Sequence, residues 1–292
     1  MIRNSNQPTR VKRILVPLDA SPHSLTALEV AADMAAGLHA ELFGLFVEDV
    51  TLYRLVDLPF ACEVSPLSSS FERLEKRQLE MQLRARAEQM KRRLAEIATQ
   101  RRIPWNFRVT RGGVSQEILQ AASEADLTIL GKVGWSLSGT SRTGSTVRAV
   151  VSRGRGWTMV LQHGTGIPTS VCVVYTGSAL ADQALETGMT LMELRKSPLQ
   201  VFIATPDRET FENRRESIAR YLAQRGVQAS YFPLRASDPV SELVRASKTG
   251  RAGTLILPCE APAFQGESLE SLLNRIQNPV LIVRERAPST GF

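Results

Sequence analysis

Residues 131–146 combine glycines, hydroxyl side chains and two cations, and they contain no carboxylate. The segment reads GKVGWSLSGTSRTGST and directly follows the apolar run LTIL. Glycines let backbone amides approach a ligand closely, hydroxyl groups and cations satisfy oxygens, and the missing carboxylates remove repulsion of an anion. The segment is therefore a candidate phosphate-binding loop, with a flexible surface turn as the alternative.

Three better-known motifs do not fit this segment. A P-loop needs a lysine where Ser145 stands. A dinucleotide-binding glycine fingerprint follows the first strand of its sheet, whereas these glycines follow the fourth predicted strand. The stretch GWSLSG is one residue too long for a nucleophilic-serine turn, and the three histidines of the chain offer no recognisable acid–base partner.

The spacing that remains is glycine, two residues, glycine, nine residues, glycine and serine. It comprises Gly131, Gly134, Gly144 and Ser145, with Thr146 following. A helix that begins near Ser145 would present amides with partial positive charge to a phosphate. Lys132 and Arg142 would add Coulomb attraction, and the alternative is that both are solvated loop residues.

The elements around this loop alternate between strands and helices. Apolar runs that predict buried parallel strands occupy 13–19, 40–49, 105–113, 126–131 and 157–164, and amphipathic stretches that predict helices lie between them. The helix after the first strand is expected to be capped by Ser21 or Ser24 and to end near Gly37. This alternation predicts an α/β fold with a parallel sheet and a ligand crevice outside the carboxyl ends of the strands.

The pattern begins again in the second half of the chain. Residues 170–186 align without gaps on 13–29, and later strands and helices follow in the same order. The repeat is long enough for each copy to be a domain. We expect an N-terminal tail at 1–11, a nucleotide-binding domain at 12–165, a second domain at 166–286 and a C-terminal tail at 287–292.

The composition limits the number of domains and the classes of protein to which the chain can belong. The 292 residues are 43% hydrophobic and 22% charged, which suits two globular domains. The start of the chain is polar and no apolar run is long enough to cross a bilayer, so we expect a cytoplasmic protein. Cys62, Cys172 and Cys259 are too scattered to suggest a disulfide framework or a zinc site.

The net charge of +7 is concentrated in one segment. Residues 72–102 hold ten Lys or Arg against five Glu, while Leu83, Ala87, Met90, Leu94 and Ile97 form one apolar helical stripe. The pattern predicts a solvated helix that packs by one face, and a nucleic-acid surface is the less favoured alternative.

The two copies together resemble the universal stress protein family. The resemblance rests on RILVPLDAS in the first strand, ADLTILG in the fourth, the glycine spacing, and NPVLIVR as the last strand of the second copy. It implies two tandem domains of the HUP or Rossmann-like α/β type, each with a five-stranded parallel sheet flanked by helices. In the ATP-binding branch of the family the glycine motif holds ATP, with or without Mg²⁺.

The resemblance also implies roles for single residues. Asp19 would meet the ribose and adenine side, although it could instead be a helix N-terminal carboxylate, and Val47 would offer backbone contacts to adenine. Gly131 and Gly134 would let the chain pass close to the nucleotide. The phosphates would be held at a helix N-terminus by Gly144, Ser145 and Thr146. Further candidates for ATP contacts are Pro17, Lys132 and Arg142.

The second copy departs from this pattern. Thr176 stands opposite Asp19 and Pro258 opposite Gly131. The segment CEAPAFQGESLES, which includes Glu260, Glu267 and Glu270, would repel phosphate. We therefore expect this copy to be degenerate and structural, and to pair with the first copy through the apolar edges TMVLQHG and PVLIVRE, which should not be left open to solvent.

The function predicted from the sequence is a nucleotide-responsive stress or regulatory factor that binds ATP and acts on an unidentified protein partner, with homodimerisation a further prospect. No general base, nucleophile or metal-binding carboxylate pair stands out, so we expect at most slow ATP hydrolysis. The alternatives are a nucleotide-activating transferase of the same fold and a nucleic-acid-binding protein that uses residues 72–102.

Overall fold

The computed structural model describes residues 11–56, 62–64, 71–73, 76–132, 143–154, 156–161, 170–235, 237–249 and 253–285. The helices are α1 (Pro22–Leu38), α2 (Val50–Val56), α3 (Lys76–Arg101), α4 (Val114–Ser123), α5 (Ser145–Arg153), α6 (Ala179–Arg195), α7 (Arg208–Ala223), α8 (Pro239–Lys248) and α9 (Gly266–Arg275), with a 3₁₀ turn η1 at Pro262–Phe264. The strands are β1 (Arg13–Pro17), β2 (Glu41–Asp49), β3 (Cys62–Val64), β4 (Phe71–Arg73), β5 (Trp105–Gly112), β6 (Leu127–Gly131), β7 (Trp157–Leu161), β8 (Val171–Tyr175), β9 (Leu199–Thr205), β10 (Ala229–Arg235), β11 (Thr254–Pro258) and β12 (Val280–Val283).

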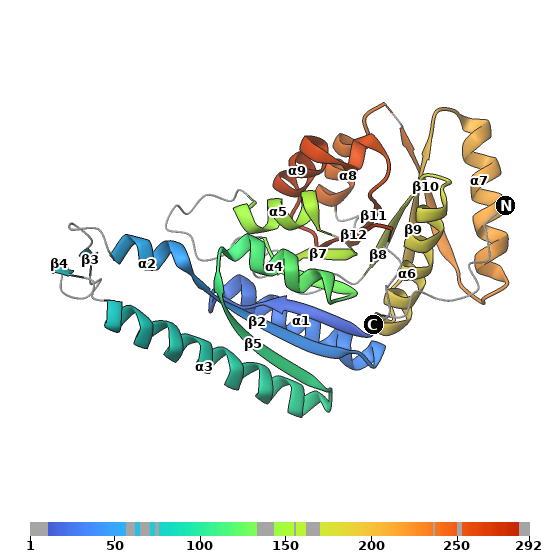
Figure 1. Ribbon diagram of the computed structural model, residues 1–292. Coiled ribbons are helices and arrows are strands. Elements are labelled where there is room, and N and C mark those ends of the chain that lie inside the picture. Colours follow the sequence, from blue (N-terminus) through green and yellow to red (C-terminus); the bar gives the residue numbers. More distant parts are fainter. Residues whose placement is uncertain are drawn as a thin grey trace.

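Ten of these strands form one sheet, in the order β10-β9-β8-β11-β12-β7-β6-β1-β2-β5. Every neighbouring pair is parallel except β7 and β12. The strands from β5 to β7 and those from β10 to β12 follow the same order relative to the chain, so the sheet consists of two halves of equal topology (Figure 1). The predicted α/β fold with a mostly parallel sheet is confirmed.

The two halves meet at the antiparallel pair β7–β12, in the middle of the sheet. Val160 pairs with Val280 and Met159 with Leu281. All four side chains are buried. The two apolar runs that should not be left open to solvent therefore cover each other, which satisfies the backbone groups that an edge strand would leave unpaired.

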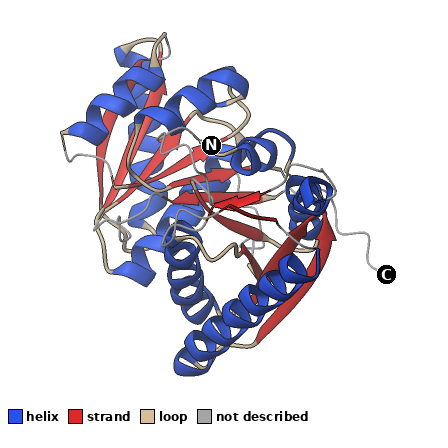
Figure 2. Cartoon of the chain, turned by 90° about the vertical axis from the view of Figure 1, so that its left-hand side faces the viewer, coloured by secondary structure: helices blue, strands red, loops and turns tan. Residues whose placement is uncertain are grey.

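Helices cover both faces of the sheet (Figure 2). Each face has its own apolar layer. One buried cluster is formed with α1, α3, α6 and α7, and the other with α4, α5, α8 and α9. Both clusters contain residues from the two halves, so the chain buries one continuous core on each face of the sheet.

Helix α1 begins as predicted and ends near Gly37 as predicted, but Gly37 is not its C-terminal cap. Ser21 is its cap, with a side chain that accepts a hydrogen bond from Ser24 N at 3.1 Å. The last residue is Leu38, and His39 follows with a left-handed φ of 54°. Gly37 lies inside the helix, where a Cβ would be 2.2 Å from Leu194 Cδ2 of α6. Its role is close packing between the two halves.

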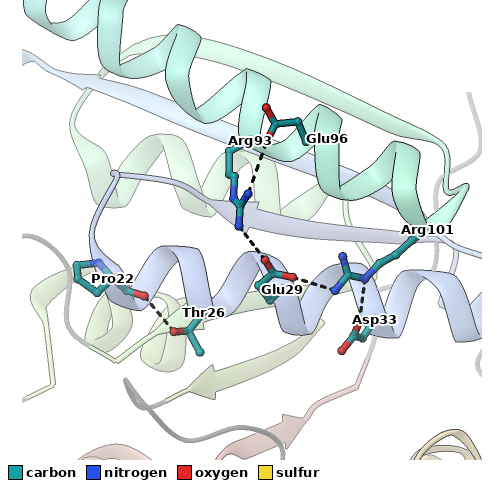
Figure 3. A network of polar contacts seen from close by, with 7 residues as sticks. All are labelled: Pro22, Thr26, Glu29, Asp33, Arg93, Glu96 and Arg101. Atoms are coloured by element: carbon teal, nitrogen blue, oxygen red, sulfur yellow. Dashed lines mark hydrogen bonds and ion pairs between the residues drawn. The ribbon is translucent and has the colours of Figure 1, made fainter.

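Helix α3 packs by the predicted apolar stripe, and two of its basic residues form ion pairs with α1. The five stripe residues named above are all buried. Arg93 contacts Glu29 at 3.4 Å, and Arg101 contacts Glu29 and Asp33, each at 2.8 Å (Figure 3). Part of the basic charge is therefore neutralised by acidic residues of the same molecule.

The Pro- and Ser-rich connection between β2 and the basic helix contains more structure than predicted, and the helix predicted over 72–102 begins at Lys76 because Glu72 and Arg73 belong to β4. Helix α2 follows β2 directly, and β3 and β4 pair as a short antiparallel hairpin. No helix in the described part of the chain is both long and apolar enough to cross a membrane.

Candidate functional site

The predicted site residues that the structure describes lie around the point in the first half of the sheet where the strand order reverses. β1 lies between β2 and β6, and the chain runs from β1 to β2 on one side and from β6 to β7 on the other. Such a switch point leaves a crevice outside the carboxyl ends of the two central strands. Pro17 and Asp19 lie at the end of β1, and Gly131 and Lys132 lie at the end of β6.

Asp19 belongs to a tight turn at the start of α1. Its Oδ1 accepts a hydrogen bond from Ser21 N at 3.0 Å, while Ser21 itself caps the helix. The Asp19 carboxylate therefore does lie at the N-terminus of α1, as the alternative to a nucleotide contact predicts, although the cap itself is Ser21. Asp19 is exposed and precedes Ala20, whose φ of 63° is left-handed.

Gly131 is required by a contact within the protein. A Cβ at this position would lie 2.6 Å from His23 Cβ and 2.8 Å from the His23 carbonyl carbon. The missing side chain lets the first turn of α1 pack against the end of β6. The sequence assigned this glycine to the passage of a nucleotide and missed His23, because nothing in the spacing indicates that α1 approaches so closely.

Lys132 is a buried cation. It is 1% exposed, and its Nζ has no hydrogen-bond or ion-pair partner among the described residues. Burial lowers the pKa of its ammonium group. Lys132 N donates to Leu161 O at 2.7 Å, so the strand alternation continues and places the side chain on the same face as Leu130, which packs with α5.

The start of α5 lies beside Lys132. Gly144 N donates to Lys132 O at 3.0 Å, and Gly144 is the N-cap residue, in an extended conformation. No side chain of the described residues caps this helix, so its first amides are available to an anion. Ser145 is exposed and Thr146 half-buried. The candidates Gly134 and Arg142 lie outside the described residues.

Val47 lies near the end of β2, on the same edge of the sheet, and is half-buried. The next residue, Glu48, is buried and accepts hydrogen bonds from Tyr53 Oη at 3.2 Å and Arg111 Nε at 2.8 Å. The hydrogen bond to Glu48 raises the pKa of Arg111, and desolvation by burial and the Glu48 charge raise that of Tyr53. Glu48 and Tyr53 are buried and Arg111 is exposed, so the group links the end of β2 to α2 and β5, and the sequence analysis did not find it.

The corresponding place in the second half is occupied by a carboxylate of the chain itself. Glu260, shortly after β11, accepts a hydrogen bond from Thr176 Oγ1 at 3.0 Å and another from Ser178 Oγ. Thr176 and Ser178 follow β8, so Glu260 bridges the switch point of this half. Gln265 Nε2 also donates to Glu260 O at 2.9 Å and holds the loop in place.

No group of three or more His, Cys, Asp or Glu side chains that could hold a metal ion occurs in the ranges that the structure describes. Burial raises the pKa of the Cys172 thiol to about 11, which makes it unreactive, as expected of a small buried apolar residue.

Comparison with known proteins identifies solved structures with the same fold and a family model that matches the first half of the chain. The solved structure of a universal stress protein from Archaeoglobus fulgidus DSM 4304 matches with a TM-score of 0.71 at 17% identity, over 95% of this chain and 98% of that one. A functionally unknown protein from Pseudomonas aeruginosa PAO1 matches with a TM-score of 0.64 at 14% identity, over 96% of this chain and 95% of that one. No protein with a curated description matches in sequence.

The likeness to these two structures shows the fold alone. The family model described as the universal stress protein family matches residues 10–160, which include the switch point, Lys132 and the start of α5. This match covers more than half of the chain, and by it the chain belongs to the universal stress protein family.

Proposed function

We propose that the protein binds ATP in a domain formed by residues 12–165. The adenine and ribose would lie over the ends of β1 and β2, near Asp19 and Val47, and the phosphates would lie against Gly144 and meet the amides of Ser145 and Thr146. Gly134 and Arg142 complete the proposed set, together with Pro17 beside the end of β1. Any Mg²⁺ would enter with the triphosphate.

The observation that carries this proposal is Lys132. A buried ammonium group without a partner is costly, because burial removes its hydration and nothing replaces it. Lys132 lies next to an α5 N-terminus that no described side chain caps. An anionic group placed there would compensate the lysine and the helix amides together.

We propose that residues 166–286 form a second domain of the same type that has lost the nucleotide site. Glu260 occupies its switch point with a negative charge and is held there by Thr176 and Ser178. A phosphate would have to displace this carboxylate and would be repelled by it. ATP would then bind at one site per chain.

In this proposal ATP acts as a ligand that changes the affinity for a protein partner, as a stress-responsive regulator requires. The second candidate, a nucleic-acid surface on α3, is disfavoured by the ion pairs that Arg93 and Arg101 make with α1. Steeply salt-dependent binding to nucleic acid would support that candidate.

The test is a calorimetric titration of the whole chain with ATP, for which we expect one site. Gly144→Val should abolish binding, because a branched side chain blocks the approach of phosphate to the amides. Gly113→Val is the matched control, since Gly113 is the N-cap of α4 and also extended. Two equivalent sites, or normal binding by Gly144→Val, would contradict the proposal.

A further inference from the structure

Helix α5 of the first half and helix α9 of the second lie close together on the same face of the sheet, near the β7–β12 pair (Figure 1). Thr143, the residue before the α5 cap, is 5% exposed and makes two hydrogen bonds to Asn274 of α9. Thr143 N donates to Asn274 Oδ1 at 2.9 Å, and Thr143 Oγ1 donates to the same oxygen at 2.8 Å. The second half therefore contacts the backbone immediately before the proposed phosphate-binding residues.

The chemistry of this contact fixes the orientation of the Asn274 amide. A backbone N–H can only donate, so the atom that faces Thr143 must be the carbonyl oxygen. Two donors of one residue converge on that oxygen, which restricts both the backbone and the side chain of Thr143. The amides of residues 144–146 follow directly along the chain.

A second contact ties the two helices together one turn further along. Arg148 Nη1 lies 3.5 Å from Glu270 Oε1. Both side chains are substantially exposed, so this ion pair contributes little in water. Asn274 is the residue of α9 whose contact is partly buried and directed at the backbone.

We infer that Asn274 is a positioning residue for the nucleotide site, supplied by the second half of the chain. This inference rests on the proposed ATP site. By holding Thr143, Asn274 orders the N-terminal turn of α5 before the ligand arrives, so that less conformational entropy is lost on binding. Since coupling is reciprocal, bound ATP strengthens the contact between α5 and α9.

The sequence could not indicate this role, because Asn274 lies 131 residues from Thr143 in the chain. The fold also places Glu270, predicted to repel phosphate, in an ion pair with Arg148. On this inference the second half is retained because it shapes the site that the first half carries.

The experiment compares three variants of the full chain. Asn274→Leu removes the acceptor at similar size, Asn274→Asp keeps an acceptor for Thr143, and Gln265→Leu is the control. Gln265 lies at the opposite end of α9, and among the described residues its side-chain amide bonds only to backbone oxygens of residues 259 and 260. Hydrogen exchange of residues 143–147 is measured first, without nucleotide.

We expect exchange of residues 143–147 to be about tenfold faster in Asn274→Leu, the effect of losing about 1.4 kcal/mol of local stability. Asn274→Asp and Gln265→Leu should exchange like the unchanged chain. This measurement does not need ATP, so it tests whether Asn274 orders residues 143–147 even if the chain does not bind nucleotide. Unchanged exchange in Asn274→Leu would overturn the inference.

The second measurement is ATP affinity by calorimetry. Asn274→Leu should bind about tenfold more weakly and Gln265→Leu normally. If Asn274→Leu does not fold, Thr143→Val tests the same contact from the other side and should weaken binding about threefold, because one of the two hydrogen bonds remains. In the double variant the two effects should not add. Normal affinity in both single variants, in a chain that does bind ATP, rejects the inference and leaves the proposed site intact.

Discussion

Leu94 of α3 lies directly over Gly44 of β2. A Cβ on Gly44 would be 2.4 Å from Leu94 Cδ1 and 2.9 Å from the ring of Phe107. Leu94 is fully buried, whereas the neighbouring Arg92 and Arg93 are exposed. The basic helix is therefore fastened to the sheet by its apolar stripe, and its charges lie on the other faces.

Replacing Leu94 should cost more stability than reversing two charges of the same helix. Leu94→Asp buries an unpaired carboxylate over β2 and should lower the free energy of unfolding by about 3–5 kcal/mol. Reversal of Arg92 and Arg93 to Glu should cost about 1 kcal/mol or less, because their contacts are exposed. Thermal or urea unfolding measures both, and the opposite ranking would indicate a functional charged surface.

Lys132→Met should stabilise the protein and weaken ATP binding at the same time. Removing a buried cation that has no partner in the described part of the chain relieves a cost of about 1–3 kcal/mol. Met keeps a similar length and apolar stem. Unfolding of the free protein measures the first effect and calorimetry the second. A variant that is less stable, or that binds ATP as tightly as the unchanged chain, contradicts the assignment.

The pH dependence of that gain has a defined sign. The pKa of Lys132 is lowered from 10.5 in the folded protein. Between the lowered value and 10.5 the unfolded chain binds more protons than the folded one, so the contribution of Lys132 to stability becomes more favourable as the pH rises. The advantage of Lys132→Met should therefore be largest at low pH and shrink toward pH 10.5. An advantage that grows with pH would exclude the buried-cation explanation.

Gly131→Ala should displace the first turn of α1. The added Cβ meets both the side chain and the backbone of His23, and the backbone cannot move aside alone. We expect a loss of about 1–3 kcal/mol. Gly113→Ala is the control, because a Cβ there has no atom within 4 Å, and it should cost under about 1 kcal/mol. Equal effects would show that the His23 contact is not restrictive.

Ala20 and Gly177 occupy equivalent turns and should respond in opposite ways. Ala20 has a φ of 63° and Gly177 a φ of 90°. A left-handed conformation costs a residue with a Cβ about 1–2 kcal/mol, and glycine nothing. Ala20→Gly should therefore raise the melting temperature and Gly177→Ala should lower it. The same sign for both would mean that packing at these turns outweighs backbone strain.

A fragment of residues 1–166 should self-associate. It ends shortly after β7 and would expose Met159 and Val160 together with the unpaired backbone of that strand. Light scattering during gel filtration should show a dimer or larger species. A stable monomeric fragment with unchanged ATP affinity would remove the need for the second half.

The sequence predicts the sheet and most of its helices because their patterns are strong. Buried parallel strands are nearly continuous apolar runs, and α3 has a clear helical stripe. Helix α2 and the β3–β4 hairpin were missed because the Pro- and Ser-rich stretch around them carries no such period. The order of elements in the second half follows from its likeness in sequence to the first.

The ligand-binding roles of Pro17, Asp19, Val47 and Gly131 came from the family resemblance. The structure places these residues at or near the ends of β1, β2 and β6, which share one edge of the sheet, and their role in binding stays a prediction. The burial of Lys132, the contact of His23 with Gly131 and the two hydrogen bonds to Asn274 depend on how helices pack. Residue types and spacing do not encode those distances.

The two halves that meet at the β7–β12 pair have equal topology but belong to one covalent chain. A substitution can therefore alter one half and leave the other unchanged. In an assembly of two identical subunits, any substitution alters both sites at once. Here Glu260 bridges one switch point while Lys132 is buried at the other, so the two halves are not interchangeable. A partner that recognises the junction would meet it in one orientation and in a ratio of one to one.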